Sequence, residues 1–235
     1  MTWSIVARDP ATGAFGVAVT TKFFAVGALC PHAGACAGAL ATQALVNPTF
    51  GPRGLALLAA GASAEHVLAT LIASDAGRAT RQLHLVDRAG LVAAHTGSDC
   101  IGWCGHRAGA GFSVAGNMLA GEAVVAATHA SFAASAGRPF ALRLIEALDA
   151  GQAQGGDKRG KQSAALKIHA SEDYPFLDLR VDDHPEPLVE LRRLLAVSEG
   201  RFAAFRSFMA TRANPSGVFD RAIIEAEVQR REAAQ

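Results

Sequence analysis

The chain has 235 residues and a formal net charge of +1 at pH 7, and hydrophobic residues make up 50% of it. The 22 Lys and Arg against 21 Asp and Glu exclude the basic surface typical of proteins that bind nucleic acid or anionic membranes. No segment reaches the ~20 continuous apolar residues of a membrane-spanning helix, and a signal peptide is not evident. We therefore expect a cytoplasmic protein with a small-molecule substrate, no nucleic acid and no membrane partner.

Short apolar runs separated by glycines fill the first part of the chain. Residues 4–7 predict a buried strand that stops at the turn signal Asp9-Pro10, and the runs GAFGVAVTT and GACAGALATQALV follow. Continuous apolar runs leave no side of a strand for water, so they predict sheets that are covered on both faces.

Helical spacing replaces these runs over residues 52–74, where Gly61 ends one predicted helix and Ser63 caps a second. The segments RQLHLVD and GLVAAHTG flank turn residues 88–90, which predicts a hairpin, and GAGFSVAGNMLAG is read as strand and turn.

The second half of the chain begins with a helical pattern over residues 122–150, broken at residues 137–139 into two helices. Strands are predicted for QSAALKIHA and YPFLDLRVDD, and two more helices start after Pro185 and at Phe219. This order predicts an α+β fold of stacked sheets with helices outside, in a single domain over residues 1–235 whose helical extension starts at about residue 196. Apolar side chains on the outer helix near Leu188 predict a homo-oligomer.

The second residue suggests a catalytic mechanism. Methionine aminopeptidases remove Met1 when the next residue is small, so we expect the mature chain to begin with Thr2. A threonine hydroxyl is a weak nucleophile without a base, whereas an α-amino group titrates near ~8 and can take the proton. Thr2 would then supply nucleophile and base together, and the reaction would need no metal and no other cofactor.

The opening TWSIVARDPATGAFGVAVTTKF resembles that of N-terminal-nucleophile hydrolases. Nearly the whole chain, to about residue 195, resembles the uncharacterised family called domain of unknown function 1028, which belongs to that superfamily. The resembling segments are SIVARDP, FFAVG, ATQALVNPTFGPRGL, VAAHTG, GGDKRGKQSAAL and LDLRVDDHPEPLVELRRLL. The resemblance implies a four-layer αββα sandwich of two antiparallel sheets between helical layers, but it implies no particular reaction.

Four residues are candidates for catalysis. Besides Thr2, Lys22 follows an apolar strand and could lower the proton affinity of the nucleophile, although most lysines at strand ends are only solvated. Gln43 interrupts an apolar run, where it should bond either backbone or a ligand. Asn117 ends another strand, and its amide could donate to an oxyanion or simply shape a turn.

The candidates for substrate binding lie in turns and at strand ends. An arginine beside a turn can clamp a carboxylate, and the glycines of GGDKRGKQS allow backbone close to a ligand while its Asp and Arg anchor an amine and a carboxylate. An exposed charged loop is the alternative for that segment. These candidates are Arg53, His95, Asp157, Arg159, Gln162 and Ser163.

The resulting hypothesis is an amidohydrolase that cleaves a small amide or peptide-like C–N bond through Thr2. The alternative is a non-catalytic protein on the same fold that binds a metabolite or a partner. Ser4 is the next hydroxyl along the strand, but no base for it is evident in the sequence.

A metal-dependent hydrolase is a third possibility. Its ligands would come from Asp178, Asp182, Asp183 and His184, although Arg180 between them favours ion pairs. The four cysteines do not have the C-x-x-C spacing of structural zinc sites, and we expect reduced, largely buried thiols rather than disulfides. They are Cys30, Cys36, Cys100 and Cys104.

Overall fold

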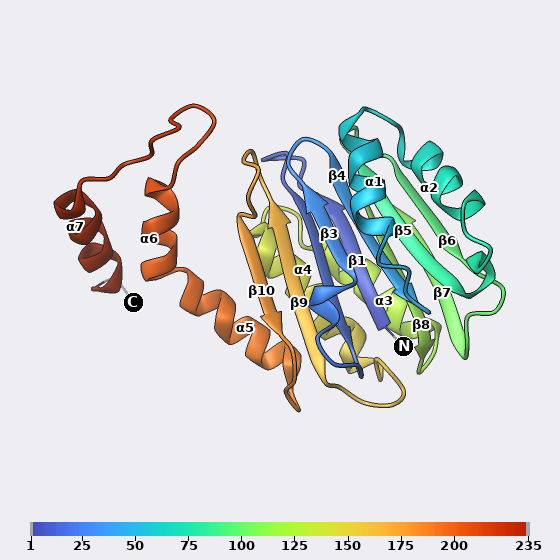
Figure 1. Ribbon diagram of the computed structural model, residues 1–235. Helices are drawn as coiled ribbons and strands as arrows, with labels where there is room; N and C mark the ends of the chain where they lie inside the picture. Colours follow the sequence, from blue (N-terminus) through green and yellow to red (C-terminus); the bar gives the residue numbers. More distant parts are fainter. Residues whose placement is uncertain (1, 234–235) are drawn as a thin grey trace. The chain divides into compact units, whose positions relative to one another are not determined.

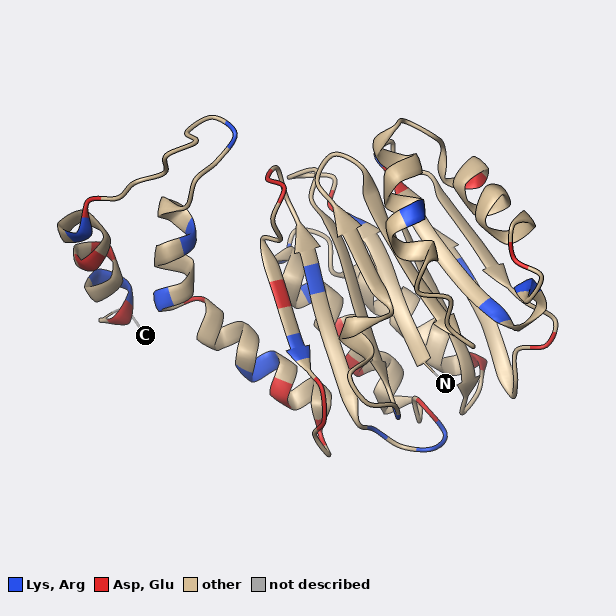
Figure 2. Cartoon of the chain, viewed as in Figure 1, with Lys and Arg blue, Asp and Glu red and all other residues tan. Residues whose placement is uncertain are grey.

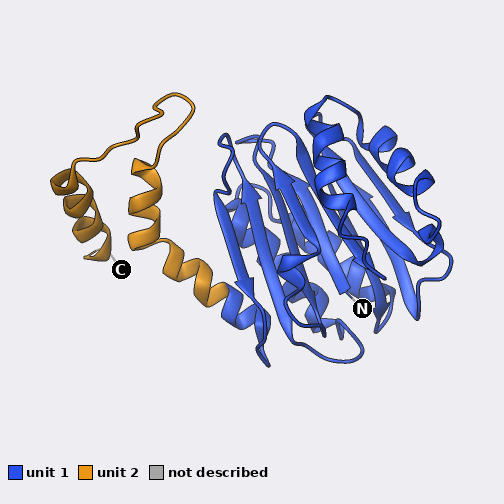
Figure 3. Ribbon diagram, in the orientation of Figure 1, with its two compact units in different colours: residues 1–191 blue, residues 192–235 orange. Residues whose placement is uncertain are grey.

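The computed structural model of the protein describes residues 2–233 and contains two compact units. The first unit ends at Leu191 and the second begins at Arg192 (Figure 3). The first holds two antiparallel sheets and four helices, and the second is entirely helical and loop. The predicted α+β class with two antiparallel sheets is confirmed.

Six strands form the larger sheet, in the order β10-β9-β2-β1-β8-β7. The strand that begins at Thr2 therefore lies near its middle, between the strands that end at Thr21 and Leu119. The strands of this sheet are β1 (Thr2–Arg8), β2 (Phe15–Thr21), β7 (Trp103–Gly109), β8 (Phe112–Leu119), β9 (Ser163–His169) and β10 (Leu177–Val181).

The smaller sheet has four strands in sequence order, β3-β4-β5-β6. Its members are β3 (Pro31–Gly34), β4 (Gly38–Ala44), β5 (Arg81–Asp87) and β6 (Val92–Thr96). The predicted hairpin around residues 88–90 is the β5–β6 connection. Two edge strands, β3 and β7, were not predicted, because the glycines and the polar or exposed residues of PHAG and WCGHRAG carry no apolar run.

Helices cover the outer faces of the two sheets (Figure 1). α1 (Phe50–Ala59) and α2 (Ala64–Ala73) pack on the smaller sheet, and Ser63 caps α2 by accepting from His66 N at 3.3 Å, as predicted. α3 (Glu122–Ala134) and α4 (Phe140–Ala153) pack on the larger sheet. The 3-10 helices are η1 (Val26–Ala28) and η2 (Arg78–Thr80).

The remaining helices are α5 (Pro187–Ser198), which crosses the boundary between the units, and α6 (Arg201–Phe208) and α7 (Arg221–Glu232). The predicted extension from about residue 196 falls within the second unit. Among the helices of residues 2–233, none has both the length and the apolar character needed to cross a bilayer.

Successive side chains of each strand point to opposite faces of its sheet, so one face packs against helices and the other against the opposite sheet. On β5, Leu83 and Leu85 pack with α1 and α2, whereas Val86 packs with Val6 of β1 in the space between the sheets. The strands are therefore buried on both faces, which explains the nearly continuous apolar runs in the sequence. The layer of side chains that faces the opposite sheet is called the inter-sheet layer below.

Candidate functional site

Thr2 is held at one end of the inter-sheet layer by its two neighbouring strands. It is 7% exposed and pairs with Asn117 of β8. Its Oγ1 donates to Oγ1 of Thr21 at 3.2 Å, and Asn117 Nδ2 donates to the Thr2 carbonyl at 3.4 Å. The Thr2 hydroxyl is thus bonded to β2, and the Thr2 backbone is bonded to β8. Met1, whose removal would free the Thr2 amine, lies outside the described residues.

Below Thr2, the inter-sheet layer is made of hydrogen-bonded polar side chains. They come from β1, β4, β5 and β8, and each is at most 3% exposed. We call this group the polar half of the layer; its members are Ser4, Gln43, Gln82, His84 and Asn117.

Gln82 of β5 is the centre of the polar half. Its Oε1 accepts from Gln43 Nε2 at 2.9 Å and from Asn117 Nδ2 at 3.0 Å. Its Nε2 donates across to the larger sheet, to the carbonyls of Gly116 at 2.8 Å and Gly105 at 3.1 Å. One fully buried amide therefore ties the two sheets together and orients Asn117 next to Thr2.

Gln43 is fully hydrogen-bonded within the protein. Its Nε2 also donates to the carbonyl of Ala115 at 3.1 Å, and its Oε1 accepts from Ser4 Oγ at 2.7 Å. Of the two roles that the sequence left open for this glutamine, the structure shows the bond to backbone. Its direct contacts within residues 2–233 do not include Thr2; the two residues are linked through Gln82 and Asn117.

Ser4 has a histidine beside it. His84 Nε2 of β5 lies 2.8 Å from Ser4 Oγ, whose own hydrogen is donated to Gln43, so His84 donates to Ser4 and is not placed as its base. Both side chains are completely buried. Burial lowers the pKa of His84 to about 3, with the charge of His106 acting in the same direction and the Ser113 carbonyl opposing it. His84 is therefore neutral at physiological pH and serves as a hydrogen-bonding partner inside the layer.

Two residues near Thr2 have left-handed backbone conformations that are unusual outside glycine. Ala44, with φ 70°, directly follows Gln43, and Met118, with φ 52°, directly follows Asn117. Such a conformation costs roughly 1–2 kcal/mol for a residue with a Cβ atom. Strained residues of this kind concentrate at functional sites, where surrounding contacts hold them in place.

Lys22 and Asp157 meet at the same end of the sandwich. The Lys22 backbone N–H donates to Asp157 Oδ2 at 2.8 Å, whereas its Nζ donates to the Lys161 carbonyl at 3.3 Å. Asp157 is also bound by its near neighbour Arg159, through the backbone N at 2.9 Å and Nη2 at 3.2 Å. The ammonium of Lys22 is thus directed to the loop that precedes β9. Asp157 holds the backbone at Lys22, directly after the end of β2.

The loop that carries Asp157 depends on a glycine. Gly156 has φ 53°, and a Cβ atom there would lie 2.7 Å from the Trp3 ring. Only glycine satisfies both conditions without strain. Figure 2 shows blue stretches of basic residues on this loop, at the end of the sandwich where β1 begins.

Gln162 and Ser163 join this loop to the end of β2. Gln162 N donates to the Thr21 carbonyl at 2.9 Å, and its side chain donates to Asp183 at 3.1 Å. Ser163 is buried; its Oγ donates to the Phe23 carbonyl at 2.6 Å and accepts from a backbone N–H of η1. Both side chains are committed to the protein's own loops.

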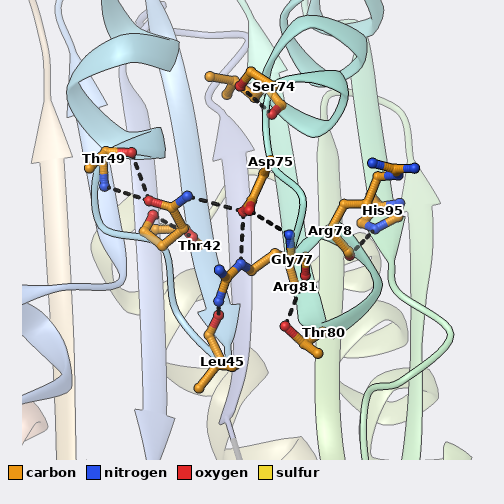
Figure 4. A network of polar contacts seen from close by, with 12 residues as sticks. Thr42, Leu45, Thr49, Ser74, Asp75, Gly77, Arg78, Thr80, Arg81 and His95 are labelled. Atoms are coloured by element: carbon orange, nitrogen blue, oxygen red, sulfur yellow. Dashed lines mark hydrogen bonds and ion pairs between the residues drawn. The ribbon is translucent and has the colours of Figure 1, made fainter.

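Arg53 belongs to α1 and His95 to β6, on the smaller sheet, and Figure 4 shows His95 beside Arg78. Arg53 Nη2 donates to Ser74 Oγ at 2.8 Å, which joins α1 to the end of α2. His95 Nε2 lies 3.0 Å from the Arg78 carbonyl of η2. Neither contact reaches Thr2.

Asp75 is the centre of the polar network in Figure 4. It accepts from Arg81 Nε at 2.8 Å, from Asn47 Nδ2 at 3.1 Å and from Gly77 N at 2.8 Å. The hydrogen bonds from Arg81 and Asn47 lower the Asp75 pKa to about 2. An ionised Asp75 therefore fixes the loop after β4, which begins beside Gln43.

The acidic residues in and just after β10 are paired rather than clustered. Asp178 pairs with Lys167 at 3.0 Å and Asp182 with Arg180 at 2.8 Å. Within residues 2–233, no three His, Cys, Asp or Glu side chains come together as a metal site would require. The four cysteines are free thiols; Cys30 is buried, Cys36 is exposed, and the other two are half-buried, so the expected largely buried set is correct only in part.

Residues 2–191 match the family described as "Family of unknown function (DUF1028)". The chain belongs to this family. The crystal structure of protein SPO2555 from Silicibacter pomeroyi, of the same family, is similar with a TM-score of 0.86 at 32% identity, over 93% of this chain and 96% of that chain. The family assignment made from the sequence motifs is thus confirmed.

Anbu (ancestral beta-subunit) from Yersinia bercovieri is also similar, over 89% of this chain and 99% of that chain. Its TM-score of 0.40 and identity of 10% are too low to inform the fold or the function. The search of curated proteins found no match.

Gln82 and His84 are the two members of the polar half that were not predicted from the sequence. They alternate with leucines in RQLHLVD, a pattern that a strand with one exposed face would also show. The signal that was available is the position of this strand in a chain whose sheets were predicted to be covered on both faces. Polar residues at alternate positions of such a strand must face a buried polar partner.

Proposed function

We propose that the Thr2 end of the inter-sheet layer is the active site of an N-terminal-nucleophile amidohydrolase. The observation that carries the proposal is the placement of Thr2 at the start of a central strand, where its hydroxyl donates to Thr21 and its backbone carbonyl accepts from Asn117. A nucleophile must be held rigidly by elements of secondary structure, and this hydroxyl is. The arrangement of helices outside two facing sheets is consistent with the αββα sandwich of that superfamily.

The reaction begins once Met1 has been removed. Thr2 Oγ attacks the carbonyl carbon of the substrate amide, and its proton passes to the Thr2 α-amine. The tetrahedral intermediate then expels the amine, which takes that proton, and leaves an ester on Thr2. Water hydrolyses the ester to release a carboxylic acid and restore the hydroxyl. No redox step is involved, and each proton is accounted for by Thr2 and water.

Asn117 is the donor that would stabilise the oxyanion. Both of its amide hydrogens are directed at acceptors, one to Gln82 at 3.0 Å and the other to the Thr2 carbonyl at 3.4 Å. The second bond is long, so a developing negative charge competes for that hydrogen effectively. Gln82 meanwhile keeps the amide group oriented.

The substrate class we propose is a small amide with a free carboxylate. Lys22 lies at this end of the sandwich together with Lys158, Arg159 and Lys161 of the loop over residues 157–161. Arg159 pairs with the buried Asp157 and Lys161 pairs with Glu186, so Lys22 and Lys158 supply the excess positive charge. Excess positive charge on a rim attracts anionic substrates and orients their carboxylates. Arg53 and His95 form no part of this rim.

The proposal is tested with Thr2→Ala and Thr2→Ser on the mature chain. A panel of small amides with and without a carboxylate is assayed for amine release, and Thr12→Ala serves as the control because that hydroxyl lies at the other end of β1. We expect Thr2→Ala to abolish turnover, Thr2→Ser to retain part of it, and Thr12→Ala to leave it unchanged. Turnover that survives in Thr2→Ala would overturn the proposal.

Binding without catalysis is the second candidate function. It is favoured by the absence of a charged group at Thr2 among the described contacts. The ammonium of Lys22 is bound to the Lys161 carbonyl, and the side-chain partners of Thr2 within residues 2–233 are a hydroxyl and an amide, so no cation there lowers the proton affinity of the hydroxyl. Saturable binding of a carboxylate-bearing amide, with no product formed and no loss of affinity in Thr2→Ala, would support this function in place of the first.

A further inference from the structure

A second hollow lies at the opposite end of the sandwich from Thr2. It has a volume of about 400 Å³ and is formed where β1 and β9 end and where the turns β1–β2, β3–β4 and β5–β6 meet. Its lining includes Arg8, Thr12, Phe15, Cys36, Arg88 and Ser171. Since β1 has seven residues at roughly 3.3 Å each, this hollow is on the order of 20 Å from Thr2. We call it the Arg8 pocket.

Two arginines give the Arg8 pocket its charge. Within residues 2–233, neither the Arg8 nor the Arg88 guanidinium has a hydrogen bond or an ion pair, and none of the lining residues is Asp or Glu. Two guanidinium groups in one concave site, with no carboxylate in the lining, are complementary to an oxyanion.

The carboxylates closest in sequence to these arginines are already bound elsewhere. Asp9 accepts from Thr12 Oγ1 at 2.6 Å and lies 3.9 Å from Arg143. Asp87 accepts three backbone N–H groups, those of Ala64 and Ala89 at 2.9 Å and that of Leu91 at 3.0 Å. Two lining hydroxyls also bond carboxylates, Thr12 that of Asp9 and Ser171 that of Glu172 at 3.0 Å. None of these three carboxylates is bonded to the Arg8 or Arg88 guanidinium within residues 2–233, so the arginine charges remain for a ligand.

Local packing holds the two arginines at the pocket. Gly90, in the β5–β6 turn that carries Arg88, packs against the Arg8 side chain, because a Cβ atom there would lie 4.0 Å from Arg8 Cδ. On the other side, the Arg8 Nη2 lies 3.9 Å from the corresponding position of Gly13. The glycine turns thus leave the guanidinium groups room to contact a bound molecule.

We propose that the Arg8 pocket binds a small molecule through a phosphate or carboxylate group. The oxyanion contacts the Arg8 and Arg88 guanidinium groups, and the volume of about 400 Å³ holds a ligand larger than the anion itself. This site is separate from the Thr2 end and does not depend on the amidohydrolase proposal.

The test is isothermal titration calorimetry of the full chain at low ionic strength, with inorganic phosphate and with succinate as probes. We expect saturable binding of at least one probe, and the probe that binds identifies the source of the oxyanion. Arg8→Gln and Arg88→Gln should each weaken it about tenfold or more, because each removes a charge-assisted hydrogen bond. Arg107→Gln, on the exposed face of β7, removes the same charge and should leave binding unchanged.

Cys36 supplies an independent readout of the location. It is exposed and lines the pocket, so a bound anion should slow its alkylation by a maleimide. Unaltered secondary structure by circular dichroism confirms that the variants are folded. The proposal is overturned if neither probe binds, if Arg107→Gln weakens binding as much as Arg8→Gln, or if binding leaves the alkylation rate of Cys36 unchanged.

Discussion

The two halves of the inter-sheet layer differ completely in chemistry, although they lie between the same strands. Toward Thr2 the layer consists of the polar half around Gln82, and toward Arg8 it consists of small apolar side chains. We call the latter the apolar half. Its strand residues include Val6, Phe15, Val17, Val19, Ala39, Ala41 and Val86.

The apolar half shows that packing alone suffices to join these sheets. Val6 and Val17 are completely buried there in a cluster of apolar side chains, which need no hydrogen-bond partners. The polar half must instead satisfy each donor and acceptor, since a buried polar group without a partner costs about 1–3 kcal/mol. Since apolar packing would also have joined the sheets here, the polar side chains call for another explanation. Their position provides one, because Gln82 bonds Asn117, which bonds the Thr2 carbonyl.

The largest effect is expected from Gln82→Leu. Leucine cannot replace the five hydrogen bonds of this amide, so partners on both sheets lose a bond in a buried layer. We expect the free energy of unfolding to fall by about 3–5 kcal/mol, measured by urea denaturation. Gln162→Leu is the control, because that half-buried amide bonds only Asp183 and should cost less than about 1 kcal/mol. Equal effects of the two variants would contradict the central role of Gln82.

The second effect concerns the pH dependence of stability. The pKa of His84 is about 3 in the folded protein, well below the ordinary histidine value of 6.5 that applies to the unfolded chain, so the unfolded chain binds one more proton between these values. Stability from neutral His84 is therefore complete above about pH 6.5 and is lost as the pH falls toward 3.

His84→Gln keeps a hydrogen-bonding partner for Ser4 and removes the titration. Urea denaturation between pH 7 and pH 4 should show a loss of a few kcal/mol in the wild type and a markedly smaller loss in the variant. His32, His106 and His169, whose pKa values are also lowered by burial, remain in both proteins. Identical slopes would show that His84 is not buried in its neutral form.

The smallest effect tests the apolar half. Val17→Thr preserves the side-chain shape but places a hydroxyl among apolar neighbours, and we expect it to lower the free energy of unfolding by about 2 kcal/mol. Val189→Thr on α5, where the valine is 65% exposed, should change it by less than about 0.5 kcal/mol. If Val17→Thr leaves the free energy of unfolding unchanged, the new hydroxyl has found a hydrogen-bond partner, and this part of the layer is not purely apolar.

The contrast between the halves also explains what could be predicted from the sequence. Continuous apolar runs such as FGVAVTT predict strands reliably because both faces of these strands are covered. The edge strands β3 and β7 escaped prediction because an edge needs no apolar pattern. Gln82 and His84 escaped because alternation alone does not say whether a polar face meets water or another sheet.

The candidate site residues belong to different parts of the fold. Thr2 and Asn117 pair directly, since both belong to central strands of one sheet. Arg53 and His95 were proposed from their positions beside a turn and at a strand end, and the structure places them in α1 and β6 with contacts to Ser74 and η2. Pairing between distant strands, as between Gln43 and Gln82, is fixed by the tertiary fold and leaves no local trace in the sequence.

The most direct test of the central claim is the intact mass of the protein produced with its native start. The Thr2 mechanism requires a free α-amine on the residue whose hydroxyl is held by Thr21. The account predicts a mass lower than that of the full sequence by one methionine residue, with Thr2 as the first residue on terminal sequencing. A mass that retains Met1 in a protein that hydrolyses amides would contradict it.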